Sequence, residues 1–416
     1  MAIKSPAPAA APDLHATLLC LLLTCLLLAG HPVAAEPLPP DWPYDTDFDD
    51  DLLHVHPELN YTQHPDWVAR WERDRLGAGA FTGAFGSSAT DELLIDAHWA
   101  LNPRLGEGGL RLRQDIVWEQ RRHLPHDRLD LWLGLEQRLS GPWGVVVQAT
   151  PAEDKEEIDL RLGGLWTSPD RTQYVQLLYL AEDITADEKD PRAPDTHDPA
   201  RGVAWLVRLA RGDWSMYSSG HWTGGHARRF PDPGASPELR AASRRSDDLV
   251  VRVRWRPAPR THLELAWRQA EDAAARAYRG EATVYDRDYA GWYRTLSARG
   301  LVPLAPRWRL RAELHGLARR ATVSGWRAMS YHRDEVLPGV WAEWSVGRDH
   351  WLELGYLGTF SRWQDAGLAE RSGFADKVEL AAVFNLGDGA GLKASLSHEV
   401  SLQRFGGASV RMVTGF

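Results

Sequence analysis

Cysteine is almost absent from this sequence of 416 residues. Its only two copies, Cys20 and Cys25, lie inside one apolar run, Leu18–Gly30. We expect that run to be removed with a leader, which leaves a chain without thiols. This excludes disulfide scaffolds, thiolate metal sites, iron–sulfur clusters and covalent haem attachment. The rest of the chain must be stabilised by packing or by a membrane.

Long apolar runs are also lacking. A helical membrane protein of this length would carry several runs of about 20 apolar residues, and Leu18–Gly30 is the only long one. It follows Lys4 and precedes Val33–Ala35, a small-residue cleavage pattern. The combination predicts a secretory signal peptide over residues 1–35, because an apolar core of about 7–15 residues before such a site is typical of one.

From residue 77 to residue 416 the chain is built from short segments in which apolar and polar side chains alternate. A period of two over such segments predicts β-strands, because successive side chains of a strand point to opposite faces. The clearest segments cover residues 129–136, 248–256, 308–318, 377–386 and 392–402.

Two kinds of connection separate these segments, and they alternate along most of the chain. Short ones hold strong turn formers, as in Ser140–Pro142 and Gly387–Gly389. Long polar ones include residues 224–246 and 319–336. Short periplasmic turns that alternate with long extracellular loops are typical of outer-membrane barrels. We therefore predict an all-β fold over residues 77–416, a single antiparallel transmembrane β-barrel of 18 strands, with 16 strands as the alternative.

A soluble β-sandwich is the alternative to a barrel, because periodicity alone fits both. A basic residue that faces lipid at the bilayer midplane costs about 2–4 kcal/mol. Arg252, Arg254 and Arg256 share one face of a segment whose other face is apolar. All 20 tryptophans follow the predicted leader, and many lie near predicted strand ends. Indole rings favour the membrane interface, so both observations favour the barrel.

The segment GGASVRMVTGF resembles the C-terminal strand of Gram-negative outer-membrane β-barrels, in which an aromatic residue follows alternating apolar residues. Val410, Met412 and Phe416 fit this membrane-insertion signal, and Thr414 fits it less well. The resemblance implies insertion by the barrel assembly machinery into the outer membrane of a Gram-negative bacterium. It also implies contact with outer-membrane lipids and lipopolysaccharide, and it singles out no transport family.

Residues 36–76 differ in composition from the barrel segments, being rich in proline and then acidic. They contain one predicted helix, Asp66–Leu76, with Trp67 and Trp71 on one face at i,i+4 spacing. The acidic run lacks the glycine and the final glutamate of a calcium loop, and we predict no metal site. We interpret the segment as a periplasmic extension with a possible periplasmic partner; whether it enters the lumen stays open.

Catalytic chemistry has little support in the sequence. Ser218, Ser219 and His221 fall on one predicted strand, and Ser219 and His221 share a face. A nucleophile also needs its base oriented by a third group, and the pattern shows none. We predict no enzyme activity, no catalytic residue, no cofactor and no nucleic-acid partner.

Arginine is abundant instead, since only five of the 48 basic residues are lysine. Rows of arginine and carboxylate side chains in a water-filled lumen can set ion selectivity. The row from Arg252 to Arg256 favours anions; the alternative is that these arginines only pair with lumen acids. The predicted pore-lining residues are Arg111, Arg113, Asp115, Asp130, Arg161, Arg252, Arg254, Arg256, Arg309, Arg311 and Glu313.

Together these patterns predict a porin-like outer-membrane channel that passes small hydrophilic solutes, anionic ones if the arginine rows line the pore. One alternative is a secretion conduit for an acidic polysaccharide, by analogy with alginate-export barrels. Another is a barrel that acts as a scaffold or sleeve for a periplasmic or surface partner. Neither the solute nor the oligomeric state can be predicted from the sequence.

Overall fold

A computed structural model describes residues 64–415, apart from 89–92, 122–127, 151–158, 182–195, 199–200, 225, 230–238, 279–286, 326–328, 348–349, 365–369, 388–389 and 402. The predicted signal peptide, the acidic run before His64, and Phe416 lie outside the described residues. Among the described residues, no helix is both long enough and apolar enough to cross a bilayer.

One helix, α4 (Pro65–Asp74), precedes a series of strands. The strands are β1 (Gly79–Ser88), β2 (Leu93–Leu101), β3 (Leu110–Arg121), β4 (Arg128–Arg138), β5 (Trp143–Ala149), β6 (Leu160–Thr167), β7 (Tyr174–Ala181), β8 (Thr196–Asp198), β9 (Arg201–Arg211), β10 (Trp214–Thr223), β11 (His226–Arg229), β12 (Leu239–Trp255), β13 (His262–Tyr278), β14 (Arg287–Ala305), β15 (Trp308–Gly325), β16 (Met329–Ser345), β17 (His350–Gln364), β18 (Arg371–Gly387), β19 (Ala390–Glu399) and β20 (Arg404–Gly415).

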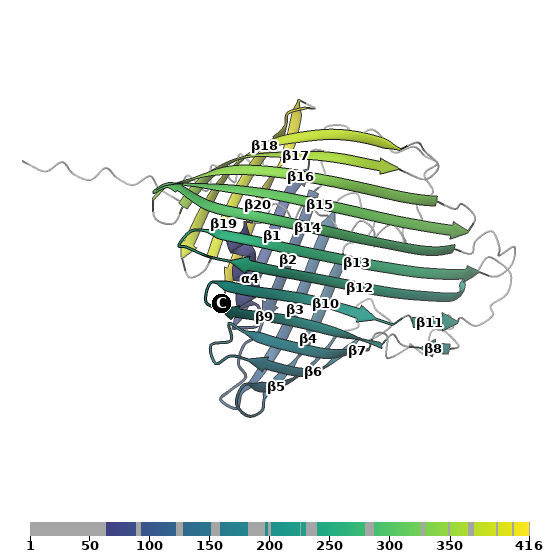
Figure 1. Ribbon diagram of the computed structural model, residues 1–416. Coiled ribbons are helices and arrows are strands. Elements are labelled where there is room, and N and C mark those ends of the chain that lie inside the picture. Colours follow the sequence, from purple (N-terminus) through teal and green to yellow (C-terminus); the bar gives the residue numbers. More distant parts are fainter. Residues whose placement is uncertain are drawn as a thin grey trace, which may run out of the picture.

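The sheet closes on itself. Each strand pairs antiparallel with its neighbours, and β1 pairs with both β2 and β20 (Figure 1). Of the 20 strands, the short β8 pairs with β11, which continues alongside β12, and neither is needed to complete the ring. The other 18 strands form the closed barrel. The prediction of 18 strands is confirmed, and the alternatives of 16 strands and a soluble sandwich are wrong.

The predicted turns join consecutive strands at one end of the barrel. Gly141 between β4 and β5 has φ 60°, and Gly212 between β9 and β10 has φ 57°. Glycine adopts this left-handed conformation without the steric penalty that a Cβ would bring. The conformation of these tight turns is therefore set by local sequence. Each turn brings together the two strands that it joins, so those strands pair.

Several strands continue into segments that we predicted as loops. β15 ends at Gly325 and β16 begins at Met329, both inside the predicted loop 319–336. β12 begins at Leu239, inside the predicted loop 224–246. Where a barrel wall rises above the bilayer, water lies on both of its faces. The alternation of polarity then stops while the ladder of backbone hydrogen bonds continues, so the sequence pattern ends earlier than the strand.

The outer face of the barrel is apolar, as the alternation predicts. On β13, Leu263, Leu265 and Trp267 are exposed, whereas His262 and Glu264 on the other face are buried. On the outer face near the tight turns, Trp214 stacks on Trp255 and Trp308 stacks on Trp344. Because tryptophan favours the membrane interface, these pairs mark the edge of the apolar band.

The apolar band on the outer face of the barrel leads to a testable prediction. Leu354, the fifth residue of β17, is 57% exposed, and Leu304 beside the turn after β14 is 64% exposed. We expect Leu354→Arg to lower the free energy of unfolding in lipid vesicles by about 2–4 kcal/mol, and Leu304→Arg by less than about 1 kcal/mol. Denaturant unfolding followed by circular dichroism measures both. Equal effects would contradict the placement of Leu354 in lipid.

Candidate functional site

The helix α4 lies inside the barrel, at the end with the tight turns (Figure 1). Its contacts reach strands from around the ring. Trp71 packs against His98 of β2, and Glu72 binds Arg254 of β12. His64, which caps the helix, lies 3.2 Å from Glu343 of β16. A helix that touches strands on several sides of a closed ring must cross its lumen.

The start and the apolar face of α4 follow from local sequence. Pro65 occupies the first turn, where its fixed φ suits a helix and its missing N–H costs nothing. The Nδ1 atom of His64 accepts a hydrogen bond from the backbone N–H of Asp66 at 3.2 Å. Trp67 and Trp71 are buried against a set of wall residues. This set consists of Ala80, Ala100, Val383 and Val413.

Glu72 connects the helix to β12. Its carboxylate is fully buried, accepts a hydrogen bond from Nη1 of Arg252 at 2.5 Å, and accepts another from Arg254. Arg254 also donates to Glu264 at 2.6 Å. Charge-assisted hydrogen bonds of this kind are among the stronger ones in proteins. Sequence reasoning missed Glu72 because nothing local distinguishes it from a solvated acid on a helix.

The C-terminal end of α4 is capped by the barrel wall. Barrel side chains donate to carbonyl oxygens of its last turn and of the residues just after it: Tyr174 to that of Glu72, Asn102 to that of Arg75 at 2.7 Å, Arg171 to that of Leu76 at 2.9 Å, and Arg111 to that of Gly77 at 3.2 Å. Positive groups are favourable here because the helix dipole places partial negative charge at this end. Arg111, predicted to line an open pore, instead holds the helix.

Buried acids and bases form a chain across the lumen face of β12 to β19. Its links are Arg254–Glu264 at 2.6 Å, Arg299–Glu264 at 3.2 Å, Arg299–Glu313 at 3.5 Å, Arg311–Glu313 at 2.9 Å, Arg311–Glu353 at 3.0 Å, Lys393–Glu353 at 2.9 Å and Lys393–Glu379 at 2.7 Å. Burial of charge is tolerated when each group is paired in this way. For Arg254, Arg311 and Glu313 the pairing interpretation therefore fits better than a free row of arginines.

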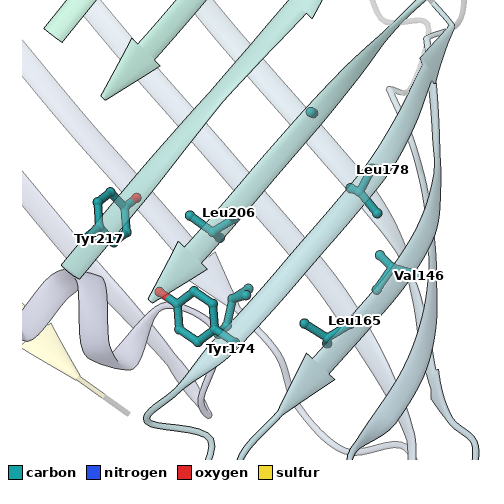
Figure 2. Packing of buried hydrophobic residues seen from close by; sticks show 8 residues of the cluster. Val146, Leu165, Tyr174, Leu178, Leu206 and Tyr217 are labelled. Atoms are coloured by element: carbon teal, nitrogen blue, oxygen red, sulfur yellow. The ribbon is translucent and has the colours of Figure 1, made fainter. Parts of the chain in front are cut away.

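Part of the lumen wall is apolar, which the polarity pattern did not predict. Val146, Leu165, Leu178 and Leu206 of neighbouring strands point inward and form a cluster with Leu76. Figure 2 shows these strand residues together with the rings of Tyr174 and Tyr217. The cluster packs the residues that follow α4 against one side of the ring.

Several wall tryptophans face the lumen instead of the membrane, among them Trp132 and Trp341. The guanidinium group of Arg161 lies 3.5 Å from the ring centroid of Trp132, and that of Arg311 lies 4.2 Å from Trp341. A cation over an indole face is attracted by the ring quadrupole. These contacts explain why both rings occupy the polar face of their strands.

Most predicted pore-lining residues do face the lumen. They are Arg111, Arg113, Asp115, Arg161, Arg252, Arg254, Arg309, Arg311 and Glu313. Arg256 follows β12, is 52% exposed, and lies 3.4 Å from Asp66 of α4. The side chain of Asp130 lies outside the described residues. Val410 and Met412 alternate with the buried Arg411 and Val413 on β20, and their role in insertion stays a prediction.

The serine and histidine residues considered for catalysis divide between two faces. Ser218 accepts a hydrogen bond from the indole N–H of Trp205 at 3.0 Å. Ser219 and His221 line a lumen cavity with Arg113 and Asp115.

Three groups able to bind a metal meet at the start of α4. Ligand atoms of His64, Glu343 and Glu353 lie within 4.8 Å of one another. The Glu343 carboxylate lies 2.7 Å from Arg309, and Glu353 accepts from Lys393 at 2.9 Å. Because basic side chains neutralise both acids, we interpret the trio as a polar contact that holds the N-cap residue His64 against the wall.

Comparisons with known proteins give only distant similarities to solved structures. No protein-family model and no curated protein match the chain. Similar solved structures include a bacterial polysaccharide outer membrane secretin, with TM-score 0.39, 9% identity, and coverage of 82% of this chain and 99% of that one. Others are the outer membrane channel DcaP of Acinetobacter baumannii (TM-score 0.33, 10% identity, 82% and 98%) and the translocator domain of the autotransporter NalP from Neisseria meningitidis (0.32, 10%, 90% and 100%).

These similarities are too low to support an argument about function. The closed antiparallel barrel with an apolar exterior is itself the architecture of Gram-negative outer-membrane proteins.

Proposed function

We propose that this protein is an outer-membrane channel that α4 keeps closed at rest. The observation that carries the proposal is a helix seated within a closed ring of 18 strands. Barrels of about 16–18 strands are wide enough for an aqueous channel. Displacement of α4 from the lumen would therefore open a path for small hydrophilic solutes.

The same displacement would change the charge of the lumen. The seated helix contributes Glu72, which neutralises Arg252 and Arg254. Its C-terminal end also occupies Arg111 and Arg171. Without the helix, Arg252 and Arg111 would lose these partners and face solution, whereas Arg254 would keep Glu264 and Arg171 would keep Glu136. Added positive charge in the lumen favours anions. We therefore propose anion preference for the open state.

A permanently closed scaffold is the second candidate function. It is favoured by the number of contacts that hold α4, which reach from His64 at its start to Leu76 beyond its end. In either role we propose that the protein is not an enzyme. A polysaccharide conduit would use the same opened lumen, and would differ from a porin-like channel in its solute.

A reversible lock on the helix tests the proposal. A Cβ built on Gly415 would lie 3.3 Å from the Cβ of Asp74, close to the disulfide range of about 3.5–4.5 Å. Because the chain after residue 35 has no cysteine, Asp74→Cys with Gly415→Cys adds a single pair. We expect openings in planar bilayers to disappear on oxidation and to return on reduction.

The single variant Asp74→Cys is the control and should respond to neither treatment. The reversal potential in a salt gradient then measures ion preference. Openings that persist in the oxidised pair would contradict closure by α4. Silence under every condition, including after Glu72→Gln, would contradict a channel and support the scaffold.

A further inference from the structure

A polar chamber of about 190 Å³ lies in the lumen beside the C-terminal end of α4. Its polar lining comes from the residues that follow the helix and from wall strands that include β3, β5, β6, β7 and β10. It contains Arg75, Arg113, Asp115, Gln148, Arg161 and Gln176, and also Asn102, Gln114, Ser219 and His221. The chamber is thus lined jointly by the helix end and the barrel.

Positive charge exceeds negative charge in this set, with three guanidinium groups to one carboxylate. Asp115 is shared, because it lies 3.2 Å from Nη2 of Arg75 and 2.5 Å from Nε2 of His98. Arg113 is buried and donates to Glu136 at 2.8 Å and to Gln176 at 2.9 Å. Glu136 is shared in turn with Arg171, at 2.8 Å. The acids around the chamber therefore each contact two basic side chains.

We propose that this chamber binds a small oxyanion, either a phosphate or a carboxylate. The planar guanidinium fork matches paired oxygens of both groups. The amides of Gln148 and Gln176 add neutral donors at buried positions. The volume is below the range of about 300–1,000 Å³ that is usual for drug-sized ligands. It suits a compact ion such as phosphate or citrate better than an oligosaccharide.

The site is complete only while the helix is seated, because Arg75 follows α4 directly. A ligand that uses Arg75 therefore stabilises the seated helix, by reciprocity of linked equilibria. This inference rests on the proposed function, in which the closed barrel is the resting state of a channel. It adds that a small oxyanion holds that channel closed.

Calorimetric titration of the full chain in detergent micelles tests binding. Sodium phosphate and sodium citrate are the two probes, and sodium chloride at equal ionic strength is the blank. We expect saturable binding of at least one probe, which Arg161→Gln weakens by roughly tenfold to a hundredfold. Arg404→Gln is the matched control, since it removes one positive charge at an exposed ion pair with Glu399. It should leave affinity unchanged.

A second variant controls for the possibility that Arg161→Gln loses binding through misfolding. Gln148→Leu keeps the wall charge and the approximate volume while it removes one donor, so it should weaken binding less than Arg161→Gln does. Binding of phosphate alone or of citrate alone identifies the ligand class and supports the site. No binding of either probe by the wild type, or equal affinity in the wild type and in both variants, would overturn it.

Conductance measurements distinguish a failure of the oxyanion site from a failure of the proposed channel. In the protein with the reduced cysteine pair, a bound oxyanion should lower the open probability of the channel. A barrel that conducts but binds neither probe overturns only the oxyanion site. A barrel that binds an oxyanion but never conducts overturns only the channel.

Discussion

Glu72→Gln is expected to raise the open probability of the barrel in planar bilayers by about a hundredfold. The substitution keeps the shape of the side chain but removes the charge that pairs with Arg252 and Arg254. Removal of one partner from a buried ion pair costs about 3–5 kcal/mol. Arg252 is 20% exposed and stays partly solvated, so we take about 3 kcal/mol. Each 1.4 kcal/mol is about a factor of ten.

This cost acts on the closed state because the helix can leave and the two arginines can then meet water. Glu107→Gln is the matched control, since Glu107 is an exposed acid between β2 and β3, and it should not change conductance. The cysteine pair introduced into the Glu72→Gln protein should close it again on oxidation. Wild-type conductance in Glu72→Gln would contradict the role of this carboxylate.

Arg311→Met is expected to give the largest loss of barrel stability, about 3–5 kcal/mol in the free energy of unfolding. The Arg311 side chain is fully buried and donates to Glu313 at 2.9 Å and to Glu353 at 3.0 Å. Its Nε atom also lies 3.1 Å from Glu343. Methionine fills much of the same space but leaves these carboxylates short of one positive charge. Denaturant unfolding in lipid vesicles measures the loss.

The exposed arginine Arg256 provides the control. It lies 3.4 Å from Asp66 and is 52% exposed, so Arg256→Gln should cost less than about 1 kcal/mol. Glu353→Gln added to Arg311→Met should recover part of the stability, because it removes one of the carboxylates that Arg311 no longer neutralises. A loss in Arg311→Met no larger than that in Arg256→Gln would show that the buried chain of charges does not stabilise the barrel.

Most of the fold could be predicted from local sequence patterns. The alternation over residues 248–256 assigns each side chain to a face, because the two faces of a barrel wall meet different solvents and successive residues point to opposite sides. Tight turns such as Gly212–Asp213 gave the strand order in the same way. The helix was also predictable, since Pro65 and the spacing of Trp67 and Trp71 are local signals.

The sequence by itself thus determined that this chain forms a closed membrane barrel with an arginine-rich interior. Only the tertiary structure decided that α4 enters the lumen and that Glu72 meets Arg252, 180 residues away in the chain. It also placed an apolar cluster around Leu178 on the inner wall. The physical reason is that contacts across a lumen depend on which strands face one another after closure, and no local period records that arrangement.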